Sequence, residues 1–597
     1  MFDVREIKDP TFLKKLNTKE LELLALDIRD FLITQISQTG GHLASNLGVV
    51  ELTIAMHYVF DSPKDKLLFD VGHQAYVHKI LTGRAKEFDT LRQLDGLSGY
   101  ISREESVHDI WESGHSSTTL SAQAGMIAAG ENRVITLIGD ASISNGIAFE
   151  GLNFLGNYQE NAPIIILNDN KMGISKSVGA LAKELNKMRG SKFKRDFKLG
   201  LIKIMPKWLS AFAHKINKIF RRKNIFDNLG FDYYGPYEGT DIKGLIKVLE
   251  TAKRLNHPTL IHVITRKGQG YIPAEKHMTD YHGLDGFDLD TGAIKHDSSL
   301  VSFSKIVADS LGYLKEQTDF SIINPAMLAG SSLNAFKQKY PDACYDVGIA
   351  EEHAVCMAAG MALAGKKVFV SMYSTFAQRA FDQMLNDVAR NNLSVKFLFD
   401  RAGVVGPDGP THQGIYDLAM LNMMPNMTVC MPKDAAEAKG LVRYMLNHNG
   451  PIVMRYPKLA VIDAKEKLIT DLRWDVIKKG SKAIIISYGA DLTKIERLSL
   501  DCYLVNARFI RPIDKDLLTN LASLDLPILV YEQVVNSGSL GQMIEDYLVA
   551  INFDMKKFKK MNFDENKVVT HGNIEEVLKR YNLGEKDIIS EYEKLCD

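Results

Sequence analysis

Short runs of β-branched and aliphatic residues, each followed by a stretch with helical spacing, recur along most of this 597-residue chain. Six such runs are clear, at residues 133–138, 163–167, 367–371, 395–399, 484–487 and 527–530. Buried apolar strands that alternate with helices are typical of parallel sheets covered by helices on both faces. The pattern therefore predicts an α/β protein with mostly parallel, doubly wound sheets.

The length of the chain allows two to four domains at roughly 150 residues each. A Gly- and Asp-rich stretch at 283–290 precedes a helix that we expect to start near Asp297 and to cover 301–311. The turn Arg455-Tyr-Pro-Lys458 marks the end of a second block. We predict three domains, each with its own sheet, at residues 1–300, 301–474 and 475–597.

Composition excludes several classes of protein. Lys and Arg number 73, as do Asp and Glu, so there is no general attraction to nucleic acid or to an acidic membrane. No segment has the ~18 uninterrupted apolar residues of a membrane span, and the N-terminus has no secretory signal. The five cysteines are scattered, as expected for small buried side chains in a reducing compartment. We expect a cytoplasmic protein without a nucleic-acid partner or stable membrane association.

One segment departs from this balance of charge. Residues 183–223 contain fourteen Lys and Arg against two acidic residues, and their apolar residues recur at helical spacing. This pattern predicts a basic amphipathic excursion whose apolar stripe packs on its own domain. Contact with a membrane surface or an anionic partner is the alternative.

The strongest chemical signal is a pair of polar motifs that each end an apolar strand. Leu137-Ile-Gly-Asp140-Ala-Ser142 is followed by Leu167-Asn-Asp-Asn170-Lys-Met172. Open α/β sheets bind ligands at the carboxyl ends of their strands. Mg²⁺ takes few protein oxygens and completes its octahedron with phosphates. The pair therefore predicts a site for a metal and a diphosphate, built on Asp140 and Asn170.

These two motifs resemble the thiamine-diphosphate signature, and further motifs narrow the family. The further motifs are Gly41-His42 to Gly48, Asp70-Val-Gly-His73-Gln-Ala-Tyr76, Gly114-His115-Ser116-Ser-Thr118, Gly268-Gln-Gly-Tyr271, Gly348-Ile-Ala-Glu351-Glu-His353, Asp400-Arg401-Ala-Gly403, Asp408 to Gly414, and Arg508 to Asp514. In this order and spacing, over nearly the whole chain, the set resembles the 1-deoxy-D-xylulose-5-phosphate synthase family, which is transketolase-like.

The resemblance implies a transferase that condenses pyruvate with D-glyceraldehyde 3-phosphate, releasing carbon dioxide and giving 1-deoxy-D-xylulose 5-phosphate. In that family the product feeds isoprenoid synthesis by the non-mevalonate pathway, as well as thiamine and pyridoxal precursors. The implied cofactors are thiamine diphosphate and Mg²⁺. The implied assembly is a homodimer, for which the Ala-, Gly- and Met-rich stretch 348–364 offers a close-packing face.

The resemblance also assigns roles to single residues. Glu351 matches the acid that bonds the cofactor's pyrimidine and makes its exocyclic nitrogen basic. Proton transfer is expected from four imidazoles, those of His42, His73, His282 and His412. Cofactor contacts are expected from His73, Gly114, His115, Ser116, Ala141, Ser142, Asn170, Tyr271 and Glu351. The expected Mg²⁺ ligands are Asp140, Asn170 and the backbone carbonyl of Met172. Substrate contacts are expected from Tyr373, Arg379, Arg401, Asp408, His412 and Lys458.

Two positions depart from the family pattern. Ala141 stands where Gly is common, and its methyl group is tolerable near a phosphate only if the backbone keeps a negative φ. Lys458 stands where Arg is usual, so that a point charge replaces a two-pronged donor. We expect a weaker grip on the substrate phosphate, or a grip shared with Arg455.

Three other functions stay open. Transketolase shares the cofactor and the overall plan but transfers a two-carbon unit without decarboxylation; the Asp70–Tyr76 and His42 motifs favour the synthase. Ala141 and Lys458 raise the alternative of an inactive cofactor-binding scaffold, which the retained Glu351 argues against. A nicotinamide dehydrogenase is disfavoured because no G-x-G-x-x-G joins a first strand to a helix.

Overall fold

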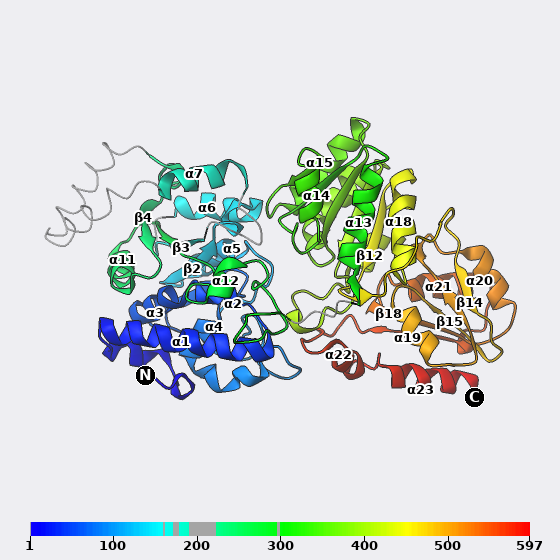
Figure 1. The fold of residues 1–597 in the computed structure, drawn as a ribbon, viewed down its shortest axis with the longest axis horizontal. Coiled ribbons are helices and arrows are strands. Elements are labelled where there is room, and N and C mark those ends of the chain that lie inside the picture. Colours follow the sequence, from blue (N-terminus) through cyan, green and yellow to red (C-terminus); the bar gives the residue numbers. More distant parts are fainter. Residues whose placement is uncertain (1, 159–160, 171–177, 190–222, 295–298) are drawn as a thin grey trace. The chain divides into compact units, whose positions relative to one another are not determined.

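The protein is described from a computed structural model that covers residues 2–158, 161–170, 178–189, 223–294 and 299–597 (Figure 1). It divides into two compact units, Met1–Arg92 with Gly96–Lys295, and Gln93–Asp95 with His296–Asp597. Most of the predicted basic segment, residues 190–222, lies outside the described residues, as do Met172 and Asp297.

A five-stranded sheet in the order β1-β2-β3-β5-β4 forms the centre of the first unit, and all its pairs are parallel. Its strands are β1 Lys66–Phe69, β2 Val134–Gly139, β3 Ile164–Asp169, β4 Asp232–Glu238 and β5 Thr259–Ile264. Side chains alternate along β3: Ile164 and Ile166 join one apolar cluster, whereas Ile165 and Leu167 join another. The sheet is therefore buried on both faces, as its unbroken apolar strands predict.

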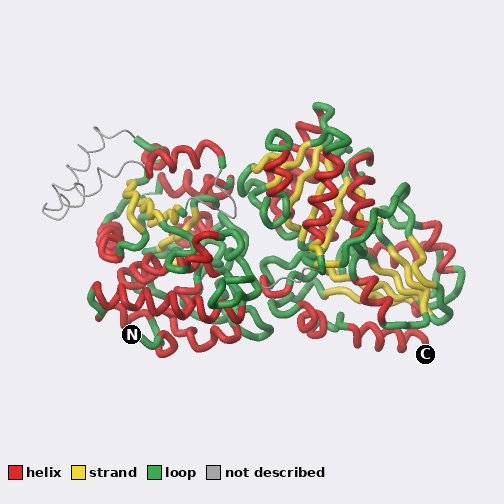
Figure 2. Tube along the Cα trace, viewed as in Figure 1, coloured by secondary structure: helices red, strands yellow, loops and turns green. Residues whose placement is uncertain are grey.

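Helices cover the two faces of this sheet (Figure 2). Helices α3 and α11 contribute to the first cluster, and α5 and α6 to the second. The α-helices that the structure describes in this unit are α1 Thr18–Thr39, α2 Leu43–Leu47, α3 Val50–Val59, α4 Tyr76–Lys79, α5 Thr119–Ala128, α6 Gly146–Gly156, α7 Gly179–Arg189, α10 Ile225–Asn228, α11 Ile242–Arg254 and α12 Ile272–Lys276.

The second unit contains a seven-stranded sheet in the order β17-β11-β12-β10-β9-β7-β8, parallel except for β17. Its strands are β7 Ser321–Asn324, β8 Cys344–Asp346, β9 Val368–Tyr373, β10 Val395–Asp400, β11 Thr428–Cys430, β12 Ile452–Tyr456 and β17 Phe509–Arg511. The accompanying helices are α13 Phe303–Lys315, α14 Asn334–Lys339, α15 Glu351–Leu363, α16 Phe381–Gln383, α17 Asp417–Asn422 and α18 Ala435–Asn447.

A second five-stranded sheet in this unit has the order β14-β16-β15-β18-β19, with only β14 antiparallel. Its strands are β14 Asp475–Lys478, β15 Ala483–Ser487, β16 Cys502–Asn506, β18 Ile528–Val535 and β19 Phe558–Phe563, and its helices are α19 Asp491–Arg497, α20 Lys515–Ala522, α21 Leu540–Ala550, α22 Ile574–Arg580 and α23 Glu585–Cys596. One apolar cluster joins Val370 and Val453 of the larger sheet to Ile484 and Val530 of this one. The two sheets therefore share a core.

The predicted α/β class, with mostly parallel sheets, is confirmed, and all six predicted strands are present. The predicted helix over 301–311 is present, but it begins two residues later than expected. Helix α13 begins at Phe303, and the Ser302 hydroxyl caps it by accepting a hydrogen bond from the Lys305 N–H at 3.2 Å. The preceding residues form strand β6 (Val301–Ser302), which pairs with β13 (Ala460–Val461) and so cannot be helical. Among the helices that the structure describes, none has the length and apolar character of a membrane span.

Candidate active site

Three neighbouring strands of the first unit end at motifs that the sequence singled out. Strands β1, β2 and β3 run parallel and pair in that order. Asp70 follows β1, Asp140 follows β2 and Asn170 follows β3. The backbone N–H of Asp140 donates to the carbonyl oxygen of Asn168 at 3.1 Å. The two predicted metal ligands therefore stand at the same edge of one sheet, as the carboxyl-end rule predicts.

The side chains of the Asn168-Asp-Asn170 run have two different surroundings. Two are buried and hydrogen-bonded inside the protein, and the third lies at this edge of the sheet. The Asn168 amide oxygen accepts a hydrogen bond from the Thr265 hydroxyl at 2.5 Å. The Asp169 carboxylate lies 2.7 Å from Nε2 of buried His262. Both side chains are buried and serve the fold, whereas Asn170 is half-buried and lies beyond the strand end.

The backbone at Ala141 has the negative φ that its methyl group requires near a phosphate. Its φ is −75° and its ψ is −42°, which is ordinary right-handed helical backbone. Ser142 directly follows and starts a short 3₁₀ turn, Ser142–Ser144. Alanine in place of glycine therefore carries no backbone penalty here.

A buried lysine that the sequence analysis did not single out, Lys267, lies near Asp140. Its side chain is almost fully buried, and burial lowers its pKa to about 8 against the opposing attraction of Asp140. An ammonium group beside the predicted metal ligand adds positive charge where a diphosphate would bind. Its position directly before the Gly268-to-Tyr271 motif was the only signal in the sequence.

The donor set fits a magnesium ion that is shared with phosphate groups. Within the described ranges, no three His, Cys, Asp or Glu side chains gather around a possible metal position. Mg²⁺ bound by phosphate oxygens needs only one or two carboxylates from the protein, so Asp140 with the Asn170 amide is sufficient. The third predicted ligand, Met172, lies outside the described residues.

Asp70 shapes the loop that carries residues 114–116. Its carboxylate accepts hydrogen bonds from the Ser117 N–H at 2.8 and 2.9 Å and from the Thr119 hydroxyl at 2.5 Å. Ser117 has a φ of 80°, a left-handed conformation that costs a non-glycine residue about 1–3 kcal/mol. The buried carboxylate stabilises this conformation, a role that the sequence analysis did not assign to Asp70.

Three of the four predicted histidines form one cluster. Ring centroids lie 5.6 Å apart for His42 and His73, 5.8 Å for His42 and His282, and 5.2 Å for His73 and His282. The Tyr76 hydroxyl lies 3.2 Å from His42 Nδ1, and the Tyr100 hydroxyl lies 3.5 Å from His42 Nε2. Imidazoles from three segments that are distant in the sequence thus meet in a partly buried polar group that is suited to proton transfer.

Tyr271 is the residue directly before α12. Its ring meets Tyr281 at 5.9 Å and Phe287 at 5.6 Å between centroids. Because Tyr281 precedes His282, this aromatic group adjoins the histidine cluster along the chain.

In the second unit, Glu351 is the first residue of α15, and only 3% of it is exposed. Burial raises its pKa to about 7, against the lowering effect of Arg379, whose Nη1 lies 3.8 Å from Oε2. Oε2 has no hydrogen-bond partner among the described residues. A buried oxygen left in this state costs free energy unless a ligand supplies the partner. Glu351 therefore fits a carboxylic acid that bonds a ligand nitrogen.

Arg401 follows β10, and Tyr373 ends the neighbouring strand β9. The Arg401 guanidinium carbon lies 4.3 Å from the centroid of the Tyr373 ring. Its Nη1 pairs with Asp400 at 2.6 Å and donates to the Ser304 hydroxyl and the Gly330 carbonyl, both at 2.9 Å. All of these polar contacts involve Nη1, so the guanidinium is held through this one nitrogen.

Tyr373 and His412 belong to one row of rings. Tyr373 stacks on Phe376 with centroids 5.5 Å apart, and Phe376 meets His412 edge-on at 5.6 Å. The Thr411 hydroxyl lies 2.9 Å from His412 Nδ1. Phe376, which no motif included, packs between the two predicted residues and contacts both rings.

Lys458 and Asp408 face each other, with Nζ 3.7 Å from Oδ2 and both side chains partly exposed. Arg455 is different. Only 1% of it is exposed, and its Nε and Nη2 donate to the Asp417 carboxylate at 2.7 and 2.8 Å. The expectation that Arg455 shares the phosphate is therefore wrong, because a buried ion pair occupies its guanidinium.

Known proteins match the chain over its whole length. Residues 4–265 match the family model for 1-deoxy-D-xylulose-5-phosphate synthase, residues 301–462 the transketolase pyrimidine-binding domain, and residues 472–588 the transketolase C-terminal domain. The 1-deoxy-D-xylulose-5-phosphate synthase of Geobacillus sp. (strain WCH70) is 42% identical over 618 residues, covering 98% of each chain. The chain belongs to the 1-deoxy-D-xylulose-5-phosphate synthase family.

A second relative agrees with this membership. The 1-deoxy-D-xylulose-5-phosphate synthase of Macrococcus caseolyticus (strain JCSC5402) is 42% identical, covering 100% of this chain and 99% of its own. Among solved structures, transketolase from Campylobacter jejuni subsp. jejuni NCTC 11168 covers 97% of this chain and 100% of its own, with a TM-score of 0.43 and 16% identity. The family-model match and the two full-length synthase relatives confirm the resemblance to the synthase family that the motifs indicated.

In this member of the synthase family, the predicted site residues are distributed over both units. Those of the first unit that the structure describes are His42, His73, Gly114, His115, Ser116, Asp140, Ala141, Ser142, Asn170, Tyr271 and His282. Those of the second unit are Glu351, Tyr373, Arg379, Arg401, Asp408, His412 and Lys458. The role of each residue stays a prediction.

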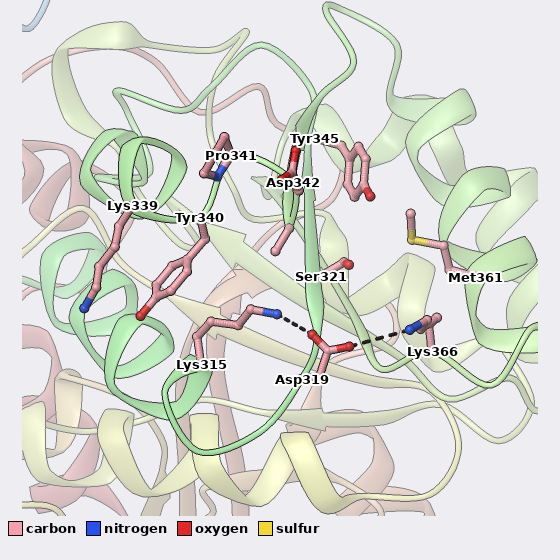
Figure 3. A pocket seen from close by; sticks show the side chains of 11 residues that line it. Lys315, Asp319, Ser321, Lys339, Tyr340, Pro341, Asp342, Tyr345, Met361 and Lys366 are labelled. Carbon is pink, nitrogen blue, oxygen red and sulfur yellow. Dashed lines mark hydrogen bonds and ion pairs between the residues drawn. The ribbon is translucent and has the colours of Figure 1, made fainter.

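A pocket of about 530 Å³ in the second unit is lined by none of these residues (Figure 3). Its lining consists of Lys315, Asp319, Ser321, Lys339, Tyr340, Pro341, Asp342, Ala343, Tyr345, Met361 and Lys366. Ser321 is the first residue of β7 and Lys366 precedes β9, so the pocket is at the amino ends of these strands. Asp319 pairs with Lys315 at 2.6 Å and with Lys366 at 3.6 Å. The predicted substrate residues follow carboxyl ends, so this pocket is not their site.

Proposed function

We propose that this chain is a thiamine-diphosphate-dependent transferase that condenses pyruvate with D-glyceraldehyde 3-phosphate to give 1-deoxy-D-xylulose 5-phosphate and carbon dioxide. The observation that carries the proposal is the full-length match to synthases of that name, at 42% identity. The product would serve isoprenoid synthesis by the non-mevalonate pathway and the precursors of thiamine and pyridoxal.

Thiamine diphosphate, when bound, supplies a nucleophilic carbon and an electron sink for decarboxylation. Asp140, Asn170 and Met172 would hold the Mg²⁺ that anchors its diphosphate. His73, the 114–116 loop and the backbone of Ala141 and Ser142 would line the rest of the cofactor, together with Tyr271. Support comes from the parallel strand ends that present Asp140 and Asn170, and from the ammonium group of Lys267 beside them.

Glu351 would act as the acid that bonds the pyrimidine. Because burial raises its pKa to about 7, the carboxyl can be either protonated or ionised near neutral pH. The protonated Oε2 can donate a hydrogen bond to a ring nitrogen, and the carboxylate can accept that proton back. Arg379, 3.8 Å away, limits how far the pKa rises.

The remaining polar side chains would bind the substrates and move protons. The imidazoles of His42, His73 and His282 can exchange protons with the reacting groups, with His412 as the counterpart in the second unit. Tyr373, Arg379 and Asp408 would contact the donor pyruvate. Arg401 and Lys458 would bind the acceptor phosphate. Arg401 would do so through its other guanidinium nitrogens, because the contacts within the protein involve Nη1.

A homodimer is part of the proposal. Residues of α15 on one face are exposed, namely His353, Cys356, Gly360 and Leu363, and Leu363 is 74% exposed. Small residues allow two helices to approach closely, and burial of an exposed leucine side chain stabilises an interface by roughly 1.5–3 kcal/mol. Sedimentation analysis of the wild type and of Leu363→Glu tests this: the wild type should be a dimer, and the variant should shift toward monomer.

Cell location and domain division complete the proposal. All five cysteines are free thiols, which agrees with a reducing cytoplasm. The proposed boundary at residue 300 lies between the first two matched segments, 4–265 and 301–462, whereas the one at residue 474 lies two residues inside the third, 472–588. Cell fractionation and limited proteolysis, respectively, test these two statements.

Product analysis decides between the synthase and its rivals. Purified chain is incubated with [1-¹³C]pyruvate, D-glyceraldehyde 3-phosphate, thiamine diphosphate and Mg²⁺, with Glu351→Gln as the matched control. The synthase releases labelled carbon dioxide and forms a five-carbon phosphosugar. Two-carbon transfer from a ketose phosphate without carbon dioxide would instead identify a transketolase. Cofactor binding with neither reaction would identify an inactive scaffold.

A further inference from the structure

Residues 401–414, here named the acceptor segment, connect β10 to the turn before α17 and carry Arg401, Asp408 and His412. Its base is closed by a pair of backbone hydrogen bonds: the Gly403 N–H donates to the Gly414 carbonyl at 2.8 Å, and the Gly414 N–H donates back at 2.9 Å. The segment is therefore a loop with one anchored base.

This loop holds conformations that need support from outside. Arg401 has a φ of 58°, and Gly403, Gly406 and Gly409 have φ values of 82°, 77° and 71°. A left-handed backbone at a non-glycine residue such as Arg401 persists only where the surrounding structure enforces it. The source of that support therefore decides how well the segment presents its side chains.

Gln413 links the segment to the C-terminal sheet. Only 1% of it is exposed, and both ends of its amide are bonded. Its Oε1 accepts from the Val405 N–H at 2.8 Å inside the segment, and its Nε2 donates to the Thr570 carbonyl at 3.0 Å. Thr570 lies between β19 and α22, the helix labelled in Figure 1.

Two further contacts reinforce this link. The Val404 N–H donates to Oε1 of Gln533 on β18 at 3.4 Å, and Gln533 in turn donates to Asp491 at 2.7 Å. On the other side, Arg455 Nη2 donates to the Gly414 carbonyl at 3.3 Å. The acceptor segment is thus held between the end of β12 and the C-terminal sheet.

We propose that Gln413 is a positioning residue through which the C-terminal sheet keeps the acceptor segment in the conformation that binds the phosphorylated aldehyde. Gln413 touches neither substrate nor cofactor in this role; it acts through the backbone that carries Arg401 and His412. The inference rests on the proposed function. It assigns the C-terminal block, which contributes none of the predicted site residues, a part in acceptor affinity.

Gln413→Met tests the proposal, because methionine keeps the volume and removes both hydrogen bonds. The KM for D-glyceraldehyde 3-phosphate should rise on the order of tenfold, the effect of losing one to two net hydrogen bonds. The KM for pyruvate should rise by a smaller factor, because two of its three proposed contacts, Tyr373 and Arg379, lie outside the segment and only Asp408 lies on it. The matched control is Gln542→Met in α21, which removes a glutamine bond to the Gly538 N–H outside the segment. It should leave both KM values unchanged.

Hydrogen exchange of the cofactor-free protein gives a readout that does not depend on activity. Amides of residues 401–414 should exchange faster in Gln413→Met than in the wild type or in Gln542→Met. The proposal is overturned if both KM values rise by the same factor, if the control gives the same rise, or if exchange in the segment is unchanged. Should Gln413→Met fail to fold, Gln533→Met removes the Val404 contact and meets the same criteria. An inactive wild type would refute the proposed function, whereas the exchange comparison would still decide on Gln413.

Discussion

Replacement of Glu351 by Gln tests the candidate site at a buried acid. The amide keeps the shape of the side chain but cannot exchange a carboxyl proton. Acid-base assistance of this kind contributes about 10²- to 10⁴-fold in rate, which corresponds to about 3–5 kcal/mol of activation free energy. We expect a loss of kcat in this range, with a smaller change in the binding of thiamine diphosphate, since the amide can still form one hydrogen bond.

The same substitution should stabilise the cofactor-free protein above neutral pH. The ordinary pKa of a glutamic acid is 4.5, and burial raises that of Glu351 to about 7. Below pH 4.5 the carboxyl is protonated in the folded and unfolded states alike. As the pH rises from 4.5 to 7 the unfolded state loses its proton first, so the folded state loses about 3 kcal/mol of stability in total. Glutamine has no proton to lose and escapes this penalty.

The assay combines two measurements on the same pair of proteins. Labelled carbon dioxide release gives kcat, and calorimetric unfolding of the cofactor-free proteins at pH 5 and pH 8 gives the difference in Tm. Glu351→Gln should be slow, and its Tm advantage over the wild type should be larger at pH 8 than at pH 5. Activity within tenfold of the wild type, or an equal Tm difference at both pH values, would refute the reasoning.

Three further substitutions test the substrate and metal residues. Arg401→Ala should raise the KM for the phosphorylated aldehyde far more than that for pyruvate, because the guanidinium is expected to bind the phosphate; equal effects would remove this role. Lys458→Arg should lower the KM for the aldehyde a few-fold, since a bidentate donor replaces a point charge, and an unchanged KM would mean that residue 458 does not reach the phosphate. Asp140→Asn should raise the Mg²⁺ concentration for half-maximal activity of EDTA-treated enzyme by roughly tenfold or more, a loss seen even for residues that only support a metal ligand. A titration curve that matches the wild type would exclude Asp140 as a ligand.

The sheets were predictable because their strands are buried on both faces. Runs such as 163–167 carry apolar residues without polar interruption, and a parallel strand covered by helices is the structure that such a run fits. The same logic placed Asp140 and Asn170 at one edge, since each directly follows a strand. The negative φ at Ala141 was stated as a condition and is met.

Tertiary contacts explain what the sequence left undecided. Arg455 looks like a phosphate ligand in a local motif, and only its contact with Asp417 shows that it is buried and paired. Lys267 and Phe376 stand beside predicted site residues through packing, which no local pattern reports. The start of α13 was misjudged because Val301 and Ser302 pair with β13, more than 150 residues later in the chain.

The edge strand β17 has a consequence for any attempt to shorten the protein. It comes from the C-terminal block, yet it pairs with β11 and completes the border of the larger sheet. A fragment that stops at residue 474 would leave β11 with unbonded backbone N–H and C=O groups, which invite other chains to add as strands. Such a fragment should aggregate on expression, even though its own sheet has all of its remaining strands.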